Sequence, residues 1–503
     1  MDNLSESHQK IKMRFERETG LSDVEYEVKD RLTGAVLVIQ LSNPTERLFG
    51  LLQKTLSDLE IPEEDGAVAT LAKKSKKDLL HAAEGRLLLR TLTESLNVNR
   101  HSFGQDFFTR YIESVSGVEQ QITANSNHIV LGRRGAGKTS LLLYALHGRE
   151  KLQQPSIWVD MQVYSQRSDV AVAADVIFEI IHQAKTIPHF SYDTSVSEKL
   201  KYLSAKEQVT EQEIRLILPE VRRCFSSLTN NNSGLFIFLD DYHVLSQELQ
   251  PLLLSLIYSF TRGNNIYIKI SAIDTLLQAW NSTSRQGLQV PHDAQELKLD
   301  YNLTIPDRAT EHIRNILDAH AAYCALASIR LLCRSNDVLS RLVWVTAGVP
   351  RDALNLFSQA MSKASLDGRQ RVTVTDVNSV ASEALANKQQ ELESDVSVDV
   401  EHLRNLMSQI QEFCIRDQRK NAFIVEIATT QPFQRIQQLV DLRLLHIINE
   451  GITTREAGRK YLALILDYSF YIGIRAAKSV DLFNKQTKKV AYKELRSLPV
   501  LRI

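Results

Sequence analysis

The sequence has little cysteine, and its four cysteines, Cys224, Cys324, Cys333 and Cys414, form no CxxC pair. This spacing argues against a disulfide framework and against a zinc cluster, and it fits a reducing cytosol best. No apolar run approaches the roughly 20 residues that span a bilayer, and the first residues are too polar for a signal peptide. We therefore expect a soluble, cytoplasmic protein with no membrane partner.

The sequence also lacks an excess of charge of either sign. Sixty Lys and Arg residues balance sixty Asp and Glu residues. Any surface for nucleic acid must therefore be local. Hydrophobic residues make up 43% of the chain and charged residues 24%, which is an ordinary globular balance. A chain of 503 residues has room for about three domains.

Residue patterns divide the chain into four parts. Residues 1–100 predict a small α+β module of unknown role, with a hairpin of strands near 24–28 and 35–39 and then a helix after Asn43-Pro44. Residues 306–390 predict a helical segment. Residues 391–503 predict helices followed by an apolar strand at 461–466, an order that is compatible with a winged helix.

The part from 101 to 305 alternates helices with short apolar strands, which predicts a parallel α/β sheet flanked by helices. The expected strands cover residues 128–131, 157–161, 235–239, 267–272 and 296–299. A helix is expected at 170–184, and Thr210 with Glu213 predicts a capping box at the start of another.

A complete phosphate-loop motif follows the first of these strands. It matches G-x-x-x-x-G-K-[ST] with an apolar strand before it and a helix after it. Backbone N–H groups of such a loop, together with the helix N-terminus, surround phosphate oxygens. Lys138 is expected to reach the β- and γ-phosphates, and the Thr139 hydroxyl to bind Mg²⁺. The motif predicts ATP as the ligand, held by Gly132, Arg133, Arg134, Gly135, Ala136, Gly137, Lys138, Thr139 and Ser140.

Two acids and a serine end neighbouring strands of the predicted sheet. The apolar run 235–239 leads into Asp240, a second candidate Mg²⁺ ligand, and Asp241, a candidate general base or water-orienting group. Ser271 ends the next strand and is a candidate for a hydrogen bond to the γ-phosphate or to the attacking water. Lys269 is expected to point away from the site because side chains alternate along a strand.

Two arginines are candidates for stabilising charge on the transferred phosphoryl group. Arg351 follows Gly348-Val349-Pro350, where proline favours a helix start. Arg285 precedes the last predicted strand, from which it could reach the nucleotide of a neighbouring subunit. With these two, the candidate catalytic residues are Lys138, Asp240, Asp241, Ser271, Arg351 and Arg285.

In this order the motifs resemble those of the AAA+ and STAND P-loop ATPases, and most closely those of the origin-recognition and replication-initiator group and its bacterial relatives. The resemblance covers residues 105–390. It rests on Gly132 to Thr139 as Walker A, Asp240-Asp241 as Walker B, Ser271 as sensor-1, and Gly348 to Arg351 as sensor-2 on a helical lid. Most relatives carry Asp-Glu at the Walker B end, whereas Asp-Asp is similar to STAND proteins. The shorter Asp241 implies hydrolysis that is slow or stimulated by a partner.

The resemblance also implies a C-terminal winged helix that holds duplex DNA. Its recognition helix would be residues 433–443, with a core face of Leu439, Leu442 and Leu445 and with Arg435, Gln438 and Arg443 as polar contacts. A basic tail follows, in which Asp481 and Glu494 oppose Arg475, Lys478, Lys485, Lys488, Lys489, Lys493, Arg496 and Arg502.

Three functions remain open on these grounds. The first is an ATP-hydrolysing switch that assembles through its ATPase domain, as a homo-oligomer or a hetero-complex, and engages DNA in replication, mobile-element handling or antiviral defence. The alternative is a STAND-type signalling ATPase with slow hydrolysis, which senses a protein trigger and controls an effector protein. A nucleotide-binding scaffold with little hydrolysis is a third interpretation.

Overall fold

The computed structural model describes residues 4–31, 34–59, 68–74, 78–100, 105–114, 117–165, 167–188, 190–226, 228, 234–299, 303, 306–395, 400–453, 459–472 and 492–502. The chain forms two compact units. One unit comprises Met1–Val98, Gly104–Ile112 and Tyr301–Ile503, and the other comprises Asn99–Phe103 and Glu113–Asp300.

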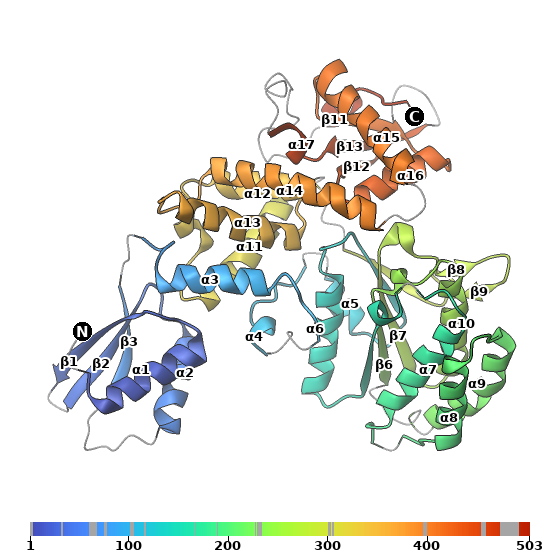
Figure 1. Ribbon diagram of the computed structural model, residues 1–503, viewed down its shortest axis with the longest axis horizontal. Helices are drawn as coiled ribbons and strands as arrows, with labels where there is room; N and C mark the ends of the chain where they lie inside the picture. The colour runs from blue at the N-terminus through green and yellow to red at the C-terminus, as the bar shows by residue number, and fades with distance from the viewer. Residues whose placement is uncertain are drawn as a thin grey trace. The chain divides into compact units, whose positions relative to one another are not determined.

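A five-stranded sheet is the centre of the second unit (Figure 1). Its strands are β4 (His128–Leu131), β5 (Ser156–Asp160), β6 (Leu235–Asp240), β7 (Ile266–Ala272) and β10 (Gln295–Lys298), in the order β10-β4-β7-β6-β5. All neighbouring pairs are parallel. The predicted parallel sheet is therefore confirmed, and each observed strand agrees with its prediction to within one residue at either end.

Helices cover both faces of this sheet. On one face, α7 (Ala171–Ala184), α8 (Thr194–Ala205), α9 (Glu211–Ser226) and α10 (Leu249–Thr261) contribute to one hydrophobic core, which also contains Ile237, Leu239 and Ile270. Helix α6 (Lys138–Lys151) covers the other face, where Arg149 lies over the ring of Phe236. Strand β6 is buried along its whole length, which explains its continuous apolar run.

Short elements complete the second unit. They are α5 (Val118–Ile122), the 3₁₀ turns η2 (Met161–Tyr164), η3 (Tyr242–Val244) and η4 (Asp274–Leu276), and the two-residue strands β8 (Trp280–Asn281) and β9 (Gln286–Gly287). The predicted capping box is present at the start of α9, where the Thr210 N–H donates to the Glu213 carboxylate at 2.9 Å.

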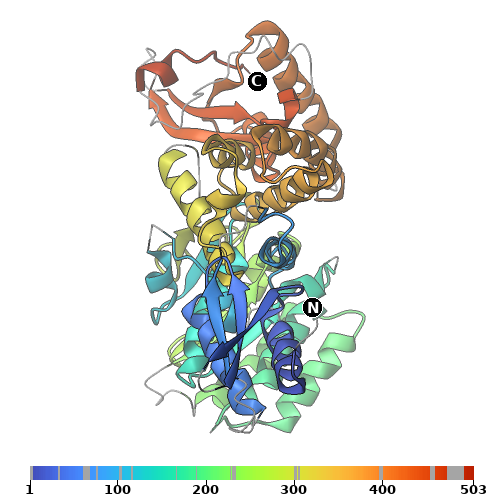
Figure 2. The same cartoon turned by 90° about the vertical axis from the view of Figure 1, so that its left-hand side faces the viewer.

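The N-terminal part of the first unit is a three-stranded sheet with two helices, α1 (Glu6–Thr19) and α2 (Glu46–Asp58), packed against it (Figures 1 and 2). Strands β1 (Glu25–Arg31) and β2 (Gly34–Leu41) form the predicted antiparallel hairpin. Strand β3 (Val68–Lys73), which the sequence analysis missed, pairs in parallel with β2. Two further helices, α3 (Ala83–Glu94) and α4 (Gln105–Phe108), follow.

The segment after residue 305 is helical, as predicted. It consists of α11 (Pro306–Tyr323), the 3₁₀ turn η5 (Ile329–Leu332), α12 (Asp337–Thr346), α13 (Pro350–Leu366) and α14 (Val374–Asp395). Its apolar residues share one hydrophobic core with those of the N-terminal sheet and of α3.

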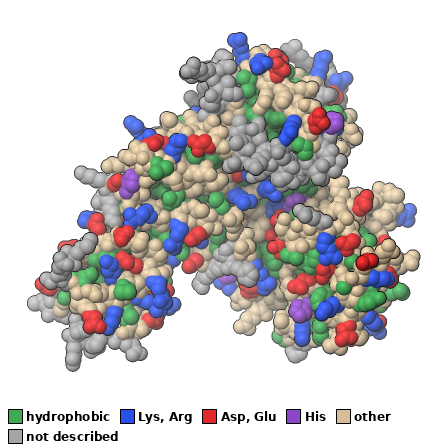
Figure 3. Space-filling model, viewed as in Figure 1, with side chains coloured by type: hydrophobic (Ala, Val, Ile, Leu, Met, Phe, Trp, Pro, Cys, Tyr) green, Lys and Arg blue, Asp and Glu red, His purple; other side chains and the backbone are tan. Residues whose placement is uncertain are grey.

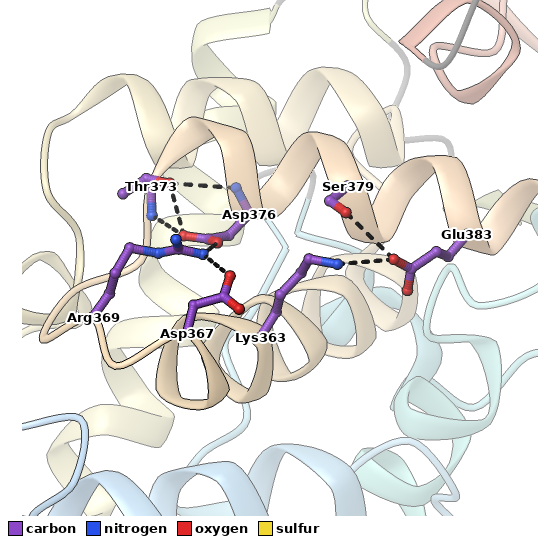
Figure 4. Close-up of polar contacts among 7 residues, drawn as sticks. All are labelled: Lys363, Asp367, Arg369, Thr373, Asp376, Ser379 and Glu383. Atoms are coloured by element: carbon purple, nitrogen blue, oxygen red, sulfur yellow. Dashed lines mark hydrogen bonds and ion pairs between the residues drawn. The ribbon is translucent and has the colours of Figure 1, made fainter.

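Polar contacts fix α14 against α13 (Figure 4). At the start of α14 the Thr373 N–H and hydroxyl donate to Asp376 at 2.8 and 2.7 Å, and Arg369 forms an ion pair with the same carboxylate. One side of α13 is joined to α14 by Lys363, whose Nζ lies 3.0 Å from the Glu383 carboxylate. The Thr373 contacts are thus local to the start of α14, whereas the Lys363–Glu383 pair joins the two helices.

The C-terminal part differs from the predicted helix, helix, strand order. It contains α15 (Val400–Glu412), the π-turn η6 (Phe413–Asp417), β11 (Ala422–Glu426), α16 (Gln431–Asp441), β12 (Leu445–Thr453), β13 (Lys460–Leu466), α17 (Ser469–Ile472) and α18 (Tyr492–Arg496). The strands form an antiparallel sheet in the order β11-β13-β12. Only β13 was predicted. The observed order, one helix, a strand, a second helix and a two-stranded hairpin, is similar to that of a winged helix.

None of the helices in the described ranges combines the length and the apolarity that crossing a lipid bilayer requires. Over the face shown in Figure 3, Lys and Arg side chains are interspersed with Asp and Glu side chains, in keeping with the equal numbers of basic and acidic residues.

Candidate active site

The phosphate loop connects β4 to α6. Gly135 and Gly137 have φ values of 79° and 95°, a region that side chains with a Cβ rarely adopt. At Gly132 the packing is tight, because a Cβ there would lie 3.2 Å from the Leu299 Cβ. Helix α6 begins at Lys138, so its free N–H groups face the loop, as phosphate binding requires.

Lys138 lies folded against the loop that precedes it. Its Nζ donates to the carbonyl oxygens of Gly132 at 3.0 Å and Arg133 at 3.2 Å, and the residue is buried. Of the other predicted loop residues, Arg133 and Ala136 are buried, and Arg134 and Ser140 are half-buried. The ammonium group is thus held at the loop where anionic oxygens would bind.

Thr139 and Asp240 meet across the gap between α6 and the end of β6. The Thr139 hydroxyl donates to Asp240 Oδ1 at 3.2 Å. Burial, and next the charge of Asp241, raises the pKa of Asp240 to about 7. A hydroxyl and a carboxylate are the hard oxygen donors that Mg²⁺ prefers, and a cation would offset the cost of a buried negative charge. The two residues therefore fit the predicted metal.

Ser271 connects the two acids. It is the last residue but one of β7, is fully buried, and donates through its hydroxyl to Asp240 Oδ1 at 2.5 Å. The same hydroxyl accepts the Asp241 N–H at 2.8 Å. Asp241 has φ 54° and ψ 42°, a left-handed conformation that aspartate tolerates better than most residues. The chain therefore turns sharply after β6, with Asp241 half-buried at the edge of the sheet.

In the sheet, β7 lies between the strand that leads into the phosphate loop and the strand that carries Asp240. Strand β4, which leads into the phosphate loop, and β6, which carries Asp240, both pair with β7, which carries Ser271. Together with the helices on both faces, this arrangement is the parallel α/β sheet that the sequence predicts around the phosphate loop.

Several solved structures resemble part of this chain at low sequence identity. ORC2 of Aeropyrum pernix, solved as ADPNP–ADP complexes, matches with 14% identity and a TM-score of 0.39 over 72% of this chain and 91% of that one. ORC1 of the same organism, in complex with DNA, matches with 16% identity and a TM-score of 0.37 over 71% of this chain and 90% of that one. The RuvB Holliday junction branch migration motor of Thermotoga maritima matches with 16% identity and a TM-score of 0.31 over 62% of this chain and 81% of that one. No protein-family model and no curated protein matches the sequence.

The structure brings together Lys138, Thr139, Asp240, Asp241 and Ser271 in one unit. Arg285 belongs to the same unit, at the exposed turn between β8 and β9, with φ 55°. Arg351 belongs to the other unit. There Gly348, with φ 74°, follows the end of α12, and Pro350 is the first residue of α13, so Arg351 is exposed in the first turn.

Lys269 is not a part of this site, but the reason given for that expectation was wrong. Residues 269 and 271 are two positions apart in β7 and thus share a face of the sheet. Lys269 lies nearer the start of the strand, where its Nζ donates to the carbonyl oxygens of Ala124 at 2.6 Å and Ser126 at 2.8 Å. Distance along the strand, rather than alternation, separates it from the acids.

Sequence reasoning missed two residues beside the site. Asp160 ends β5 opposite Asp240 and contributes to the raised pKa of that carboxyl. His243 lies in η3, directly after the acid pair. Burial, and then the charges of Lys138 and Arg134, lowers the pKa of His243 to about 3. A single histidine after two acids gives no pattern that local sequence analysis could have used.

The structure corrects the prediction that Arg443 contacts DNA. It was expected to be an exposed polar residue of a recognition helix, but α16 ends at Asp441 and Arg443 is buried in an ion pair with Asp352 of α13. Leu442 and Leu445 are buried as expected, although they follow the helix. Of the predicted basic tail, Arg475, Lys478, Lys485, Lys488 and Lys489 lie outside the described residues.

Proposed function

We propose that this chain is an ATPase that binds Mg²⁺–ATP at the loop Gly132 to Ser140 and uses it as a switch in engaging DNA. The observation that carries the proposal is the continuous set of hydrogen bonds from Thr139 through Asp240 and Ser271 to the Asp241 N–H. It unites, at one edge of the sheet, the groups that phosphoryl transfer to water requires.

Each residue has a specific role in this proposal. Lys138 leaves the loop carbonyls to bind the β- and γ-phosphate oxygens, and Thr139 and Asp240 hold Mg²⁺. The metal, when bound, neutralises charge on the phosphate oxygens. Ser271 orients Asp240 and fixes the backbone of Asp241, whose carboxylate orients the attacking water. Arg351 and Arg285 are proposed to stabilise charge on the γ-phosphate, Arg285 from a neighbouring subunit.

The DNA part of the proposal rests on α16. Phe433, Ile436 and Leu439 are buried, whereas Gln434 and Gln437 are exposed on the opposite side of this helix. Glutamine side chains can donate to and accept from base edges. We propose that this face, together with the hairpin β12–β13, forms the DNA surface.

The test is ATP hydrolysis by the purified chain with and without duplex DNA, at increasing salt. We expect DNA to stimulate hydrolysis, and the stimulation to fall steeply with salt because phosphate contacts release counterions. Gln434→Glu/Gln437→Glu places two negative charges on α16 and should abolish the stimulation. Asn405→Glu/Gln409→Glu adds the same charge to exposed positions of α15 and should not.

A second candidate function, a STAND-type signalling ATPase, is favoured by one observation, the aspartate at position 241. If ATP binds while hydrolysis is the same with and without DNA, engagement of DNA is wrong. A protein trigger and an effector partner then become the better explanation of the same site.

A further inference from the structure

His243 is held rigidly beside the phosphate loop. The residue before it, Tyr242, is fully buried, and its hydroxyl donates to the Gln250 carbonyl oxygen at 2.8 Å. One residue earlier, the Asp241 N–H is bound by Ser271. Turn η3 is closed by the Val244 N–H, which donates to the Asp241 carbonyl oxygen at 3.1 Å. The backbone of His243 is therefore fixed on both sides.

One ring nitrogen of His243 has no partner. Nδ1 is inaccessible to solvent and has no hydrogen bond within the part of the chain that the structure describes. A buried polar atom without a partner costs about 1–3 kcal/mol, so a site that keeps one gains from a ligand that supplies the missing bond.

The charges around His243 indicate which ligand this is. Lys138 and Arg134, both in the phosphate-binding segment, act on the imidazole and, together with its burial, hold it neutral at pH 7. A neutral imidazole carries one N–H, which can donate to an anionic oxygen. His243 thus lies close enough to the phosphate loop to be affected by the charges of Lys138 and Arg134, and it follows Asp241 by two residues in η3.

We propose that His243 contacts the γ-phosphate through Nδ1–H and is the residue by which this site distinguishes ATP from ADP. The inference rests on the proposed function, because it requires ATP at the phosphate loop. It adds a γ-phosphate contact on the Walker B side of the site, where Asp241 is one methylene shorter than the usual glutamate.

The experiment measures Kd for Mg²⁺–ATP and for Mg²⁺–ADP, and kcat for hydrolysis, in the wild-type chain and in His243→Ala, His243→Asn and His243→Gln. A hydrogen bond to a charged group is worth about 1.5–3 kcal/mol. The ATP affinity of His243→Ala should therefore fall about tenfold or more, with ADP affinity within about twofold of wild type. Hydrolysis should fall with it, and His243→Asn, which keeps an N–H donor, should recover part of the preference for ATP.

The control is His182→Ala, an exposed histidine of α7 in the same unit, which should leave both affinities unchanged. If His243→Ala lowered the affinities for ATP and ADP equally, the proposal would be overturned. His243 would then support the structure of the phosphate loop instead of contacting the γ-phosphate. Unchanged affinities would overturn it as well. If His243→Ala does not fold, the ratios for His243→Asn and His243→Gln decide. A wild-type chain that binds neither nucleotide would instead refute the proposed function itself.

Discussion

Thr139 and Asp240 are 101 residues apart in the sequence, and the Thr139 hydroxyl donates to Asp240 Oδ1 at 3.2 Å. Parallel strands bring this about, because the loop after β4 and the end of β6 reach the same edge of the sheet. In the proposed magnesium site, this pair supplies two oxygen ligands that already lie side by side. Such preorganisation lowers the cost of assembling a magnesium site.

Asp240→Asn tests this pair. The amide keeps the shape of the side chain but removes the charge, so the affinity for Mg²⁺ in the presence of ATP should fall about 10- to 100-fold. ATP affinity measured at increasing Mg²⁺ concentration reports the change. Asp169→Asn, at an exposed position of the same unit, should match wild type. If ATP affinity depended on Mg²⁺ concentration equally in all three proteins, Asp240 would not be a metal ligand.

Asp241→Glu tests the interpretation of slow hydrolysis. The added methylene lets the carboxylate reach further toward the water that the proposed mechanism activates, and kcat should rise about tenfold or more. Asp169→Glu makes the same change at an exposed position of the same unit and should leave kcat unchanged. A decrease in kcat for Asp241→Glu would show that the shorter acid is the better one in this site.

The motif residues could be predicted because their signals are local. The phosphate loop follows one fully buried strand, and Asp240 ends another. The predictions that were wrong or missing concern residues whose structure depends on partners far away in the sequence. Arg443 looks like a surface arginine, but it pairs with Asp352, 91 residues earlier. Strands β11 and β12 gave no clear signal, because each becomes a strand by pairing with β13 rather than by its own pattern.

The buried pair Arg443–Asp352 should contribute strongly to stability. Arg443→Met leaves the Asp352 carboxylate buried without its cation, at a cost of about 3 kcal/mol. Arg443→Met/Asp352→Leu removes both charges and should recover much of that loss. The free energy of unfolding in urea measures both effects.

A matched control is Arg416→Met, which breaks the exposed pair with Glu412 in the same unit. It should cost less than about 1 kcal/mol. Were Arg443→Met as mild as this control, the buried pair would have no special role.

Lys269 should make stability depend on pH. Burial, and then the charge of Arg149, lowers the pKa of Lys269 from 10.5 to about 6. Between these values the unfolded chain binds the proton and the folded chain does not, so the free energy of unfolding rises with pH across this window. In Lys269→Met the rise should be smaller, as measured by Tm at several pH values between 6.5 and 9.

Lys201→Met, at an exposed position of α8, provides the comparison for that experiment. It should retain the pH dependence of wild type. Identical pH profiles for Lys269→Met and wild type would mean that Lys269 keeps its proton in the folded chain.

The central claim is that Lys138 in this loop binds the phosphates of ATP. Titration of Mg²⁺–ATP into the wild-type chain and into Lys138→Ala, followed by calorimetry, tests it most directly. We predict one nucleotide bound per wild-type chain and an affinity at least about tenfold lower in the variant, because a buried cation facing the phosphates is lost. Equal affinity in the two proteins, or no binding by the wild type, would contradict the account.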